Sequence, residues 1–292
     1  MAEPQPSPAI TVPGLPARPT LRPGLRVVRR DVASLQIGVD PPHRMILPDQ
    51  PCVRRMLAEL EAGRQPVVSE PDAVRWLVRL VDAGLVVDVE PGGSAVAQFG
   101  GDARRRVAAR AHARIGVMGS VTLGRAARTA LGMAGLVPTE PGPDSDVVLV
   151  AAGGEPVRGL LDNLVRDGVP HLVLTASAAS IRLGPFVAPG RTACLRCVDA
   201  HLAEPDPRRP LVIEQVARAI EENNDEPHDP LLLALALAWA ARDLTRYVEG
   251  DEPSTWSSTV DIGAREAPHC QVWSRHPHCG CSWDEFLSEL PC

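Results

Sequence analysis

The chain has 292 residues, a net charge of -6 at pH 7, 45% hydrophobic residues and only 3% aromatic residues. This length accommodates about two domains, each with its own core. All 30 residues counted as Lys or Arg are arginines, which excludes Schiff-base chemistry and a lysine that contacts ATP phosphates. The net negative charge disfavours a nucleic-acid-binding function, because the phosphate backbone binds clusters of positive charge.

Residues 1–23 are rich in proline and predict a disordered tail. They contain no continuous apolar stretch of the kind found in signal peptides. The longest apolar run, residues 231–241, is shorter than the ~20 residues that span a bilayer. We therefore expect a cytoplasmic protein with no membrane partner.

Residues 24–90 predict a small α+β module. Short strands are expected at 25–28, 34–39 and 43–47, followed by a helix that Asp49 caps and Gly63 ends. A capping box at 69–72 opens a second helix that ends at Gly84, and a strand follows at 85–88. This order is typical of a winged-helix-like fold.

A winged-helix DNA-binding regulator is therefore one alternative for the function. Residues 1–90 hold 11 arginines and 11 acidic residues, and the second helix mixes Arg75 and Arg79 with Asp72 and Asp82. No basic recognition face results, so nucleic acid is a disfavoured partner.

Residues 91–112 predict a glycine-rich linker that ends in a run of arginines, interpreted as a solvated helix face. Residues 113–292 form the second predicted domain. A strand, tight turn and helix begin at Arg114, further strands are expected at 146–150 and 171–174, and a helix at 157–167 lies between them. This alternation indicates an α/β domain of Rossmann type with a mostly parallel sheet.

The turn after the first of these strands is an incomplete nucleotide-binding motif. Gly119 and Gly124 match the first and third glycines of G-x-G-x-x-G, but Val121 replaces the second, where a phosphate approaches the backbone. Glu140, near the expected ribose-binding position, falls in a proline-rich loop rather than at a strand end. We interpret Gly119 and Gly124 as a vestigial nucleotide turn, and ATP binding is disfavoured.

Four of the seven cysteines form two close pairs, Cys194 with Cys197 and Cys279 with Cys281. Two thiolate pairs from distant turns are what a tetrahedral structural zinc site requires. A disulfide or a redox C-x-x-C is the alternative, but it leaves the second pair unexplained. Other residues that offer a ligand nearby are Cys270, His276 and His278, whereas Cys52 lies on an apolar helix face.

Residues 184–201, with the Cys194–Cys197 pair, resemble the zinc-pair segment of ThiF-like proteins of thiazole/oxazole-modified microcin (TOMM, bacteriocin) biosynthesis. Residues 276–281 resemble that family's second pair. The resemblance implies a ThiF/MoeB-like domain over residues 113–292 and an N-terminal winged-helix element that recognises a leader peptide. It implies that the strand near 43–47 and the helix at 72–83 line the peptide groove.

Departures from the adenylating members of the wider ThiF family indicate a pseudoenzyme. Val121 interrupts the turn, lysine is absent, and Ala151 and Ala152 stand where the family's magnesium-binding aspartate is expected. No cysteine between Cys197 and Cys270 is present to form a thioester. The favoured hypothesis is a non-catalytic adaptor that presents a precursor peptide to a YcaO-type cyclodehydratase in trans. An ATP-dependent adenylyltransferase is the alternative, and the apolar helix at 231–247 suggests a homodimer by analogy.

Overall fold

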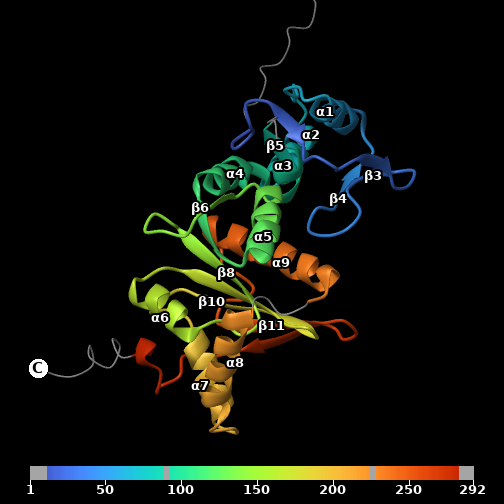
Figure 1. Ribbon diagram of the computed structural model, residues 1–292. Coiled ribbons are helices and arrows are strands. Elements are labelled where there is room, and N and C mark those ends of the chain that lie inside the picture. Colours follow the sequence, from blue (N-terminus) through green and yellow to red (C-terminus); the bar gives the residue numbers. More distant parts are fainter. Residues whose placement is uncertain (1–11, 89–92, 224–227, 283–292) are drawn as a thin grey trace, which may run out of the picture. The chain divides into compact units, whose positions relative to one another are not determined.

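The computed structural model describes residues 12–88, 93–223 and 228–282. The chain divides into two compact units, Met1–Val107 and Ala108–Cys292 (Figure 1). In these ranges no helix combines the length and the apolar character needed to cross a membrane.

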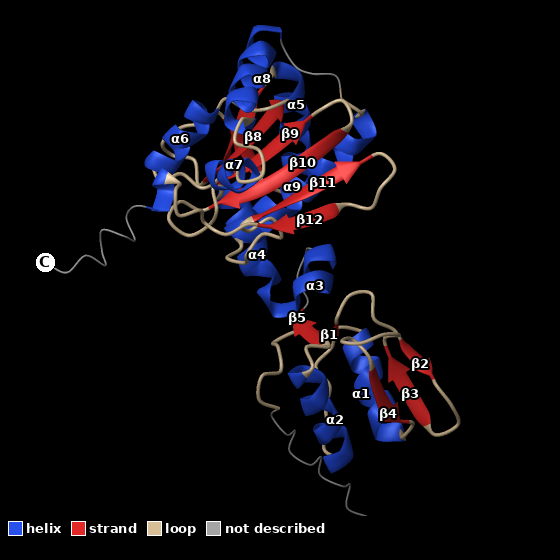
Figure 2. Cartoon of the chain, turned by 90° about the horizontal axis from the view of Figure 1, so that it is seen from below, coloured by secondary structure: helices blue, strands red, loops and turns tan. Residues whose placement is uncertain are grey.

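The first unit contains two small sheets and two amphipathic helices (Figure 2). Its elements are β1 (Pro19–Leu21), β2 (Val27–Arg29), β3 (Ser34–Ile37), β4 (Met45–Pro48), α1 (Pro51–Glu61), α2 (Pro71–Asp82), β5 (Val86–Asp88) and α3 (Gly93–Phe99). Strands β2, β3 and β4 form an antiparallel sheet in that order, which leaves β2 and β4 at its edges. Leu35, Ile37 and Leu47 pack from this sheet into the core that the buried faces of α1 and α2 share.

Two boundaries expected from composition differ from the structure. Within the predicted tail, β1 pairs antiparallel with β5. Within the predicted linker lie α3 and α4 (Ala103–His112), joined by a short 3-10 turn. Val96 of α3 packs with Val87 of β5, and Arg22 donates hydrogen bonds to the carbonyls of Ala97 and Gln98 at 2.9 and 2.8 Å. These long-range contacts order a segment that its glycine content alone marks as flexible.

Both predicted side-chain caps are wrong. Helices α1 and α2 begin after Gln50 and Glu70, neither of which makes a side-chain cap bond, and each helix has proline in its first turn. The carboxylate of Asp49 instead binds the guanidinium of Arg54, and this bond lowers the pKa of Asp49. A nearby arginine thus competes with the helix N-terminus for the carboxylate.

The second unit is built on a seven-stranded mixed sheet (Figure 2). Its strands, in spatial order, are β12 (His269–Val272), β11 (Ser258–Gly263), β10 (Ser180–Val187), β9 (His171–Ala176), β8 (Val147–Gly153), β6 (Arg114–Gly119) and β7 (Val137–Thr139). The α/β class is as predicted, and β7, β6, β8 and β9 are parallel, but β10, β11 and β12 are antiparallel additions. Residues 177–179 between β9 and β10 are too few for a crossover, so only antiparallel pairing is open to them.

Helices cover both faces of this sheet (Figure 1). They are α5 (Val121–Met133), α6 (Arg158–Arg166), α7 (Leu195–Ala203), α8 (Arg209–Asn223) and α9 (Pro230–Val248). Leu149 and Ala151 of β8 pack in the core with α5 and α9, whereas Val148 and Val150 pack in a second core with α6 and α7. The alternation follows from the two-residue period of a strand. Most of the apolar face of α9 is buried inside the unit, so the homodimer stays a prediction.

Buried His171, at the start of β9, predicts a pH-dependent stability. Burial lowers the pKa of its imidazole below the usual 6.5, although the Val169 carbonyl accepts a bond from the ring. Below about pH 6.5 the unfolded chain binds the proton more readily than the folded chain, so stability falls as pH falls through this range. We expect His171→Gln to flatten the slope of unfolding free energy against pH between about 6.5 and 5. Urea titrations across this range measure it, and an unchanged slope would contradict the assignment.

Candidate functional site

The structure brings the four predicted zinc ligands together. Their sulfur atoms form one cluster, with Sγ–Sγ distances of 3.7 Å for Cys194–Cys197, 3.5 Å for Cys194–Cys279 and 3.4 Å for Cys197–Cys281. A tetrahedral Zn²⁺ with Zn–S bonds of ~2.3 Å places its sulfurs about 3.8 Å apart. All four thiols are free, so neither pair is a disulfide. The spacing and the all-sulfur donor set therefore fit structural zinc.

Local structure fixes each half of this cluster. Cys194 is the N-cap of α7, and its carbonyl accepts the amide of Cys197 at 3.0 Å, which forms the turn between the first two sulfurs. The loop of the second pair is held by Arg275, which donates to the carbonyls of Gly190 at 3.0 Å and Cys281 at 2.6 Å. The cluster thus joins segments about 80 residues apart, and Cys194, Cys197 and Cys279 belong to the core beneath α6 and α7.

Without a cation, the four thiols cannot ionise independently. A hydrogen bond shared between Cys194 and Cys197 raises the pKa of Cys194 and lowers that of Cys197 to about 7. One thiolate is therefore stabilised by its neighbours' S–H groups. A divalent metal stabilises all four thiolates together, which is the electrostatic reason why such a cluster suits zinc.

His201 and His276 lie beside the cysteine cluster. They stabilise the loop of the second cysteine pair and are not metal ligands of the cluster. His276 Nδ1 accepts the peptide N–H of His278 at 3.1 Å, which leaves the ring proton on Nε2, 3.3 Å from a carboxylate oxygen of Glu204. His201, Glu204 and His276 lie close enough to share a metal ion. A metal bound to Nε2 of His276 would require the ring proton on Nδ1. That proton would then point at the N–H of His278 and remove the hydrogen bond between them. We therefore interpret this group as an α7-to-loop hydrogen-bond brace.

The predicted nucleotide turn lies where expected, at the β6–α5 junction. A Cβ on Gly119 would lie 2.4 Å from the carbonyl oxygen of Ala151, which is paired with it on β8. Close strand packing therefore demands this glycine, whether or not a phosphate binds. Ser120 caps α5 by accepting the amide of Leu123.

The position of Glu140 differs from the one expected from the sequence. It directly follows β7 rather than lying in an unstructured loop, and it lines a cavity of about 570 Å³ together with Gly119, Val121 and Gly124. Val121 is 88% exposed and lines the same cavity, which is compatible with the argument that its branched side chain blocks the approach of a phosphate. Against a ribose-binding role, Glu140 pairs with Arg128 at 2.6 Å.

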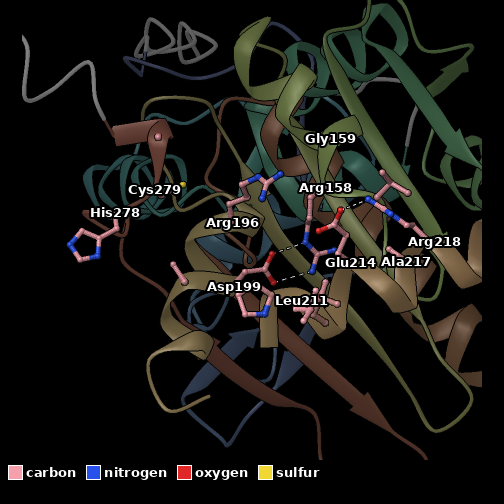
Figure 3. Close-up of a pocket in the computed structure, with 15 residues that line it drawn as sticks. Arg158, Gly159, Arg196, Asp199, Leu211, Glu214, Ala217, Arg218, His278 and Cys279 are labelled. Carbon is pink, nitrogen blue, oxygen red and sulfur yellow. Dashed lines mark hydrogen bonds and ion pairs between the residues drawn. The ribbon is translucent and has the colours of Figure 1, made fainter. Parts of the chain in front are cut away.

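A buried ion-pair network lies on the same side of the sheet as the cysteine cluster. The sequence analysis did not predict it. Arg158 donates to both carboxylate oxygens of Asp199 at 2.6 and 3.0 Å (Figure 3). It also donates to Glu155 at 2.8 Å. Arg158 and Asp199 are separated by 41 residues, and no local pattern reveals such a pair. Ala151 and Ala152 stand where the magnesium-binding aspartate of the ThiF family is expected. Glu155, two residues after β8, is the acidic residue nearest to that position in the sequence.

The run of arginines before the second unit is matched by acidic residues. Arg105 and Arg106 pair with Asp102 at 3.1 and 3.7 Å, and Arg110 pairs with Glu249. The side chain of Arg105 is 57% exposed, but those of Arg106 and Arg110 are only 14% and 20% exposed, so the solvated-face interpretation is wrong for these two.

The fold resembles those of two heterocyclase structures and of MccB, although no family model and no curated protein matches the sequence. The heterocyclase TruD is 18% identical with a TM-score of 0.71 over 91% of this chain. A heterocyclase in complex with substrate and cofactor is 13% identical with a TM-score of 0.70 over 90%. MccB of E. coli, solved with MccA, is 12% identical with a TM-score of 0.62 over 91%.

The shares of the matched proteins differ. This chain spans 43% and 39% of the two heterocyclase chains, but 99% of MccB. The chain thus has the fold of one part of these heterocyclases and of nearly all of MccB. At these identities the similarity shows the fold and not the activity.

Proposed function

We propose that this chain is a non-catalytic adaptor that binds the leader of a precursor peptide and presents it to a YcaO-type cyclodehydratase. The carrying observation is the structural match: 91% of the chain follows the heterocyclase fold, over 43% of the TruD chain. This proposal agrees with the TOMM resemblance of the cysteine segments.

The first unit, which we propose to be a winged-helix leader-binding module, offers an edge for a peptide. Strand β4 pairs only with β3 among the strands described, and its Ile46 is 41% exposed. An extended peptide could add beside β4, since strand addition gains main-chain hydrogen bonds while side-chain pockets supply specificity. The opposite edge is less open, because the amide of Val27 in β2 already donates to Glu61.

Peptides selected from a displayed random library provide the test. They are expected to slow amide exchange in residues 45–48, and Ile46→Arg is expected to weaken binding at least about tenfold by placing a charge in an apolar contact. The matched control is Val28→Arg on β2, which is 50% exposed and should leave affinity unchanged. Equal losses in both variants, or protection elsewhere, would contradict a β4 site.

The second unit would then serve as a zinc-pinned scaffold. Four sulfur ligands leave no open coordination position, so a zinc ion here would stabilise structure and would not activate water. Cys194, Cys197, Cys279 and Cys281 would hold it.

Adenylyl transfer is the second candidate, favoured by the cavity at the β6–α5 turn. Gly119, Gly124 and Glu140 surround the same cavity, and MccB was also solved with ATP. The Arg128–Glu140 ion pair and the lack of lysine oppose it. ATP-dependent pyrophosphate exchange by the purified chain would establish this function, and its absence at millimolar ATP would reject it.

A further inference from the structure

A polar cavity of about 330 Å³ lies at the carboxyl ends of β8 and β9, on the side of the sheet where Figure 2 shows α8. Strands β10 and β11 and helix α8 supply its other walls. Neither the cysteine cluster nor the proposed peptide edge uses a residue of this cavity. The carboxyl ends of parallel strands commonly bind small molecules in α/β proteins, and this volume lies at the small end of ligand sites.

The lining of the cavity has no net charge, because its four charged side chains are Glu155, Arg182, Arg209 and Asp261. Two of the four satisfy each other. Arg182 donates to both carboxylate oxygens of Asp261 at 2.7 and 3.1 Å, and this bond raises the pKa of Arg182. One cation and one anion, Arg209 and Glu155, therefore stay outside this pair.

Arg209 lies at the start of α8, and its side chain has no partner in residues 12–88, 93–223 or 228–282. Its Nε is buried without a hydrogen bond, although the carboxylate of Glu155 lines the same cavity. Only the main chain of Arg209 is bonded, with its amide donating to the carbonyl of Asp206 at 3.0 Å. Buried donors are nearly always matched by an acceptor. A ligand carboxylate would match the planar guanidinium in shape and charge.

Glu155 is the complementary anion, and it uses only one of its oxygens. Its Oε2 accepts from Arg158 at 2.8 Å, but Arg158 also donates to both oxygens of Asp199. One guanidinium thus serves two carboxylates, which leaves negative charge on Glu155 incompletely balanced. Its Oε1 has no partner in the described part of the chain. This oxygen would accept a hydrogen bond from an ammonium group.

Two hydroxyl groups complete the polar lining. Thr175 on β9 and Ser180 on β10 face the cavity, and neither hydroxyl is hydrogen-bonded to another described residue. Ser177 differs, because its Oγ donates to the carbonyl of Ser180 at 2.8 Å. A hydroxyl can donate or accept. The free hydroxyls can therefore bond to either end of a ligand with two opposite charges.

We propose that this cavity binds a small zwitterion, an α-amino acid, with its carboxylate on Arg209 and its ammonium group on Glu155. The ligand and the lining then both carry zero net charge. A simple anion would instead lie beside Glu155, and a simple cation beside Arg209. Val216 is the one branched apolar residue of the lining, and it would contact a small side chain of the ligand. This inference is independent of the proposed leader-peptide function.

Equilibrium dialysis of the full chain against radiolabelled L-alanine tests the proposal. We expect one site with a dissociation constant of about 1 mM or lower. Propionate and ethylamine each carry one of the two charges of alanine. As competitors, they should bind at least about tenfold more weakly than unlabelled L-alanine, because each loses one charge-assisted hydrogen bond.

Variants on each side of the cavity assign the two ends of the ligand. Arg209→Gln and Glu155→Gln should each weaken L-alanine binding at least about tenfold. Arg209→Gln should also remove the advantage of L-alanine over ethylamine, and Glu155→Gln its advantage over propionate. Arg218→Gln is the matched control, since Arg218 lies on the same helix, pairs with Glu214 and is outside the cavity. It should leave the affinity unchanged.

The outcomes separate a ligand site from a solvated cavity. Lack of saturable L-alanine binding up to about 10 mM would overturn the proposal. Equal affinities for L-alanine, propionate and ethylamine would also overturn it, as would unchanged affinity in folded Arg209→Gln protein. Arg209 is outside the Arg158 network, so its variant separates ligand binding from the stability of that network. Losses confined to the two cavity variants would establish the site.

Discussion

Replacing Cys197 with serine is expected to reduce bound zinc from about one equivalent to near zero and to destabilise the second unit by at least about 5 kcal/mol. The physical reason is that one ion, bound as proposed, would join the N-terminus of α7 to the loop after β12. Structural zinc contributes on the order of 10 kcal/mol of binding free energy in small domains, and that energy becomes folding energy when the apo site is not preformed. Metal analysis and thermal unfolding of the purified variant measure both effects.

Cys270→Ser provides the matched control. Cys270 lies on β12 close to the same loop, but it is exposed and outside the sulfur cluster. Its substitution should leave zinc content and unfolding temperature unchanged. Less than half an equivalent of zinc in the wild-type protein, prepared without chelators, would contradict the zinc assignment itself.

The cysteine spacing was informative because its chemistry is local. A C-x-x-C pair at a helix start and a C-x-C pair in a turn each place two sulfurs side by side before any long-range contact is known. The structure adds that the two pairs meet, with Sγ atoms 3.4–3.7 Å apart. Cys292, the seventh cysteine, lies outside the described residues, as do residues 1–11 of the predicted tail.

Other features left no local pattern to find. The antiparallel strand β10 contains Gly184 and Pro185 and was not predicted as a strand, since both residues are unfavourable within sheets. Phe186 nevertheless is fully buried between Tyr247 and Trp256, with ring centroids 4.7 and 5.7 Å away. Tertiary packing therefore outweighs the local propensity here, and one sequence without an alignment carries no signal for such contacts.

The position of Glu140 shows the same limit near the nucleotide turn. Proline and glycine in the surrounding residues suggested a loop, yet Val137–Thr139 pairs in parallel with β6. A three-residue edge strand is too short to give a periodic pattern. The acidic residue consequently lies closer to a Rossmann arrangement than its sequence context indicates, although Arg128 holds it.

Substituting Arg158 with methionine is expected to lower the free energy of unfolding of the second unit by about 3–5 kcal/mol. The side chain of Arg158 is only 10% exposed, and Asp199 and Glu155, which bind it, are 17% and 24% exposed. Removing the guanidinium leaves two poorly solvated carboxylates next to each other. The large effect comes from those uncompensated charges rather than from the intrinsic strength of the ion pairs.

The matched control is the neighbouring pair of Arg196 with Asp162, which has comparable bond lengths of 2.6 Å but a 52% exposed arginine. Solvent screens this pair, so Arg196→Gln should cost no more than about 1 kcal/mol. Adding Asp199→Asn to Arg158→Met should recover part of the loss, because one of the two stranded charges is removed. Urea unfolding followed by amide exchange in β8 and α7 reports on the second unit alone. Equal small losses for Arg158→Met and Arg196→Gln would mean that water reaches the Arg158 network, and that burial does not set its energy.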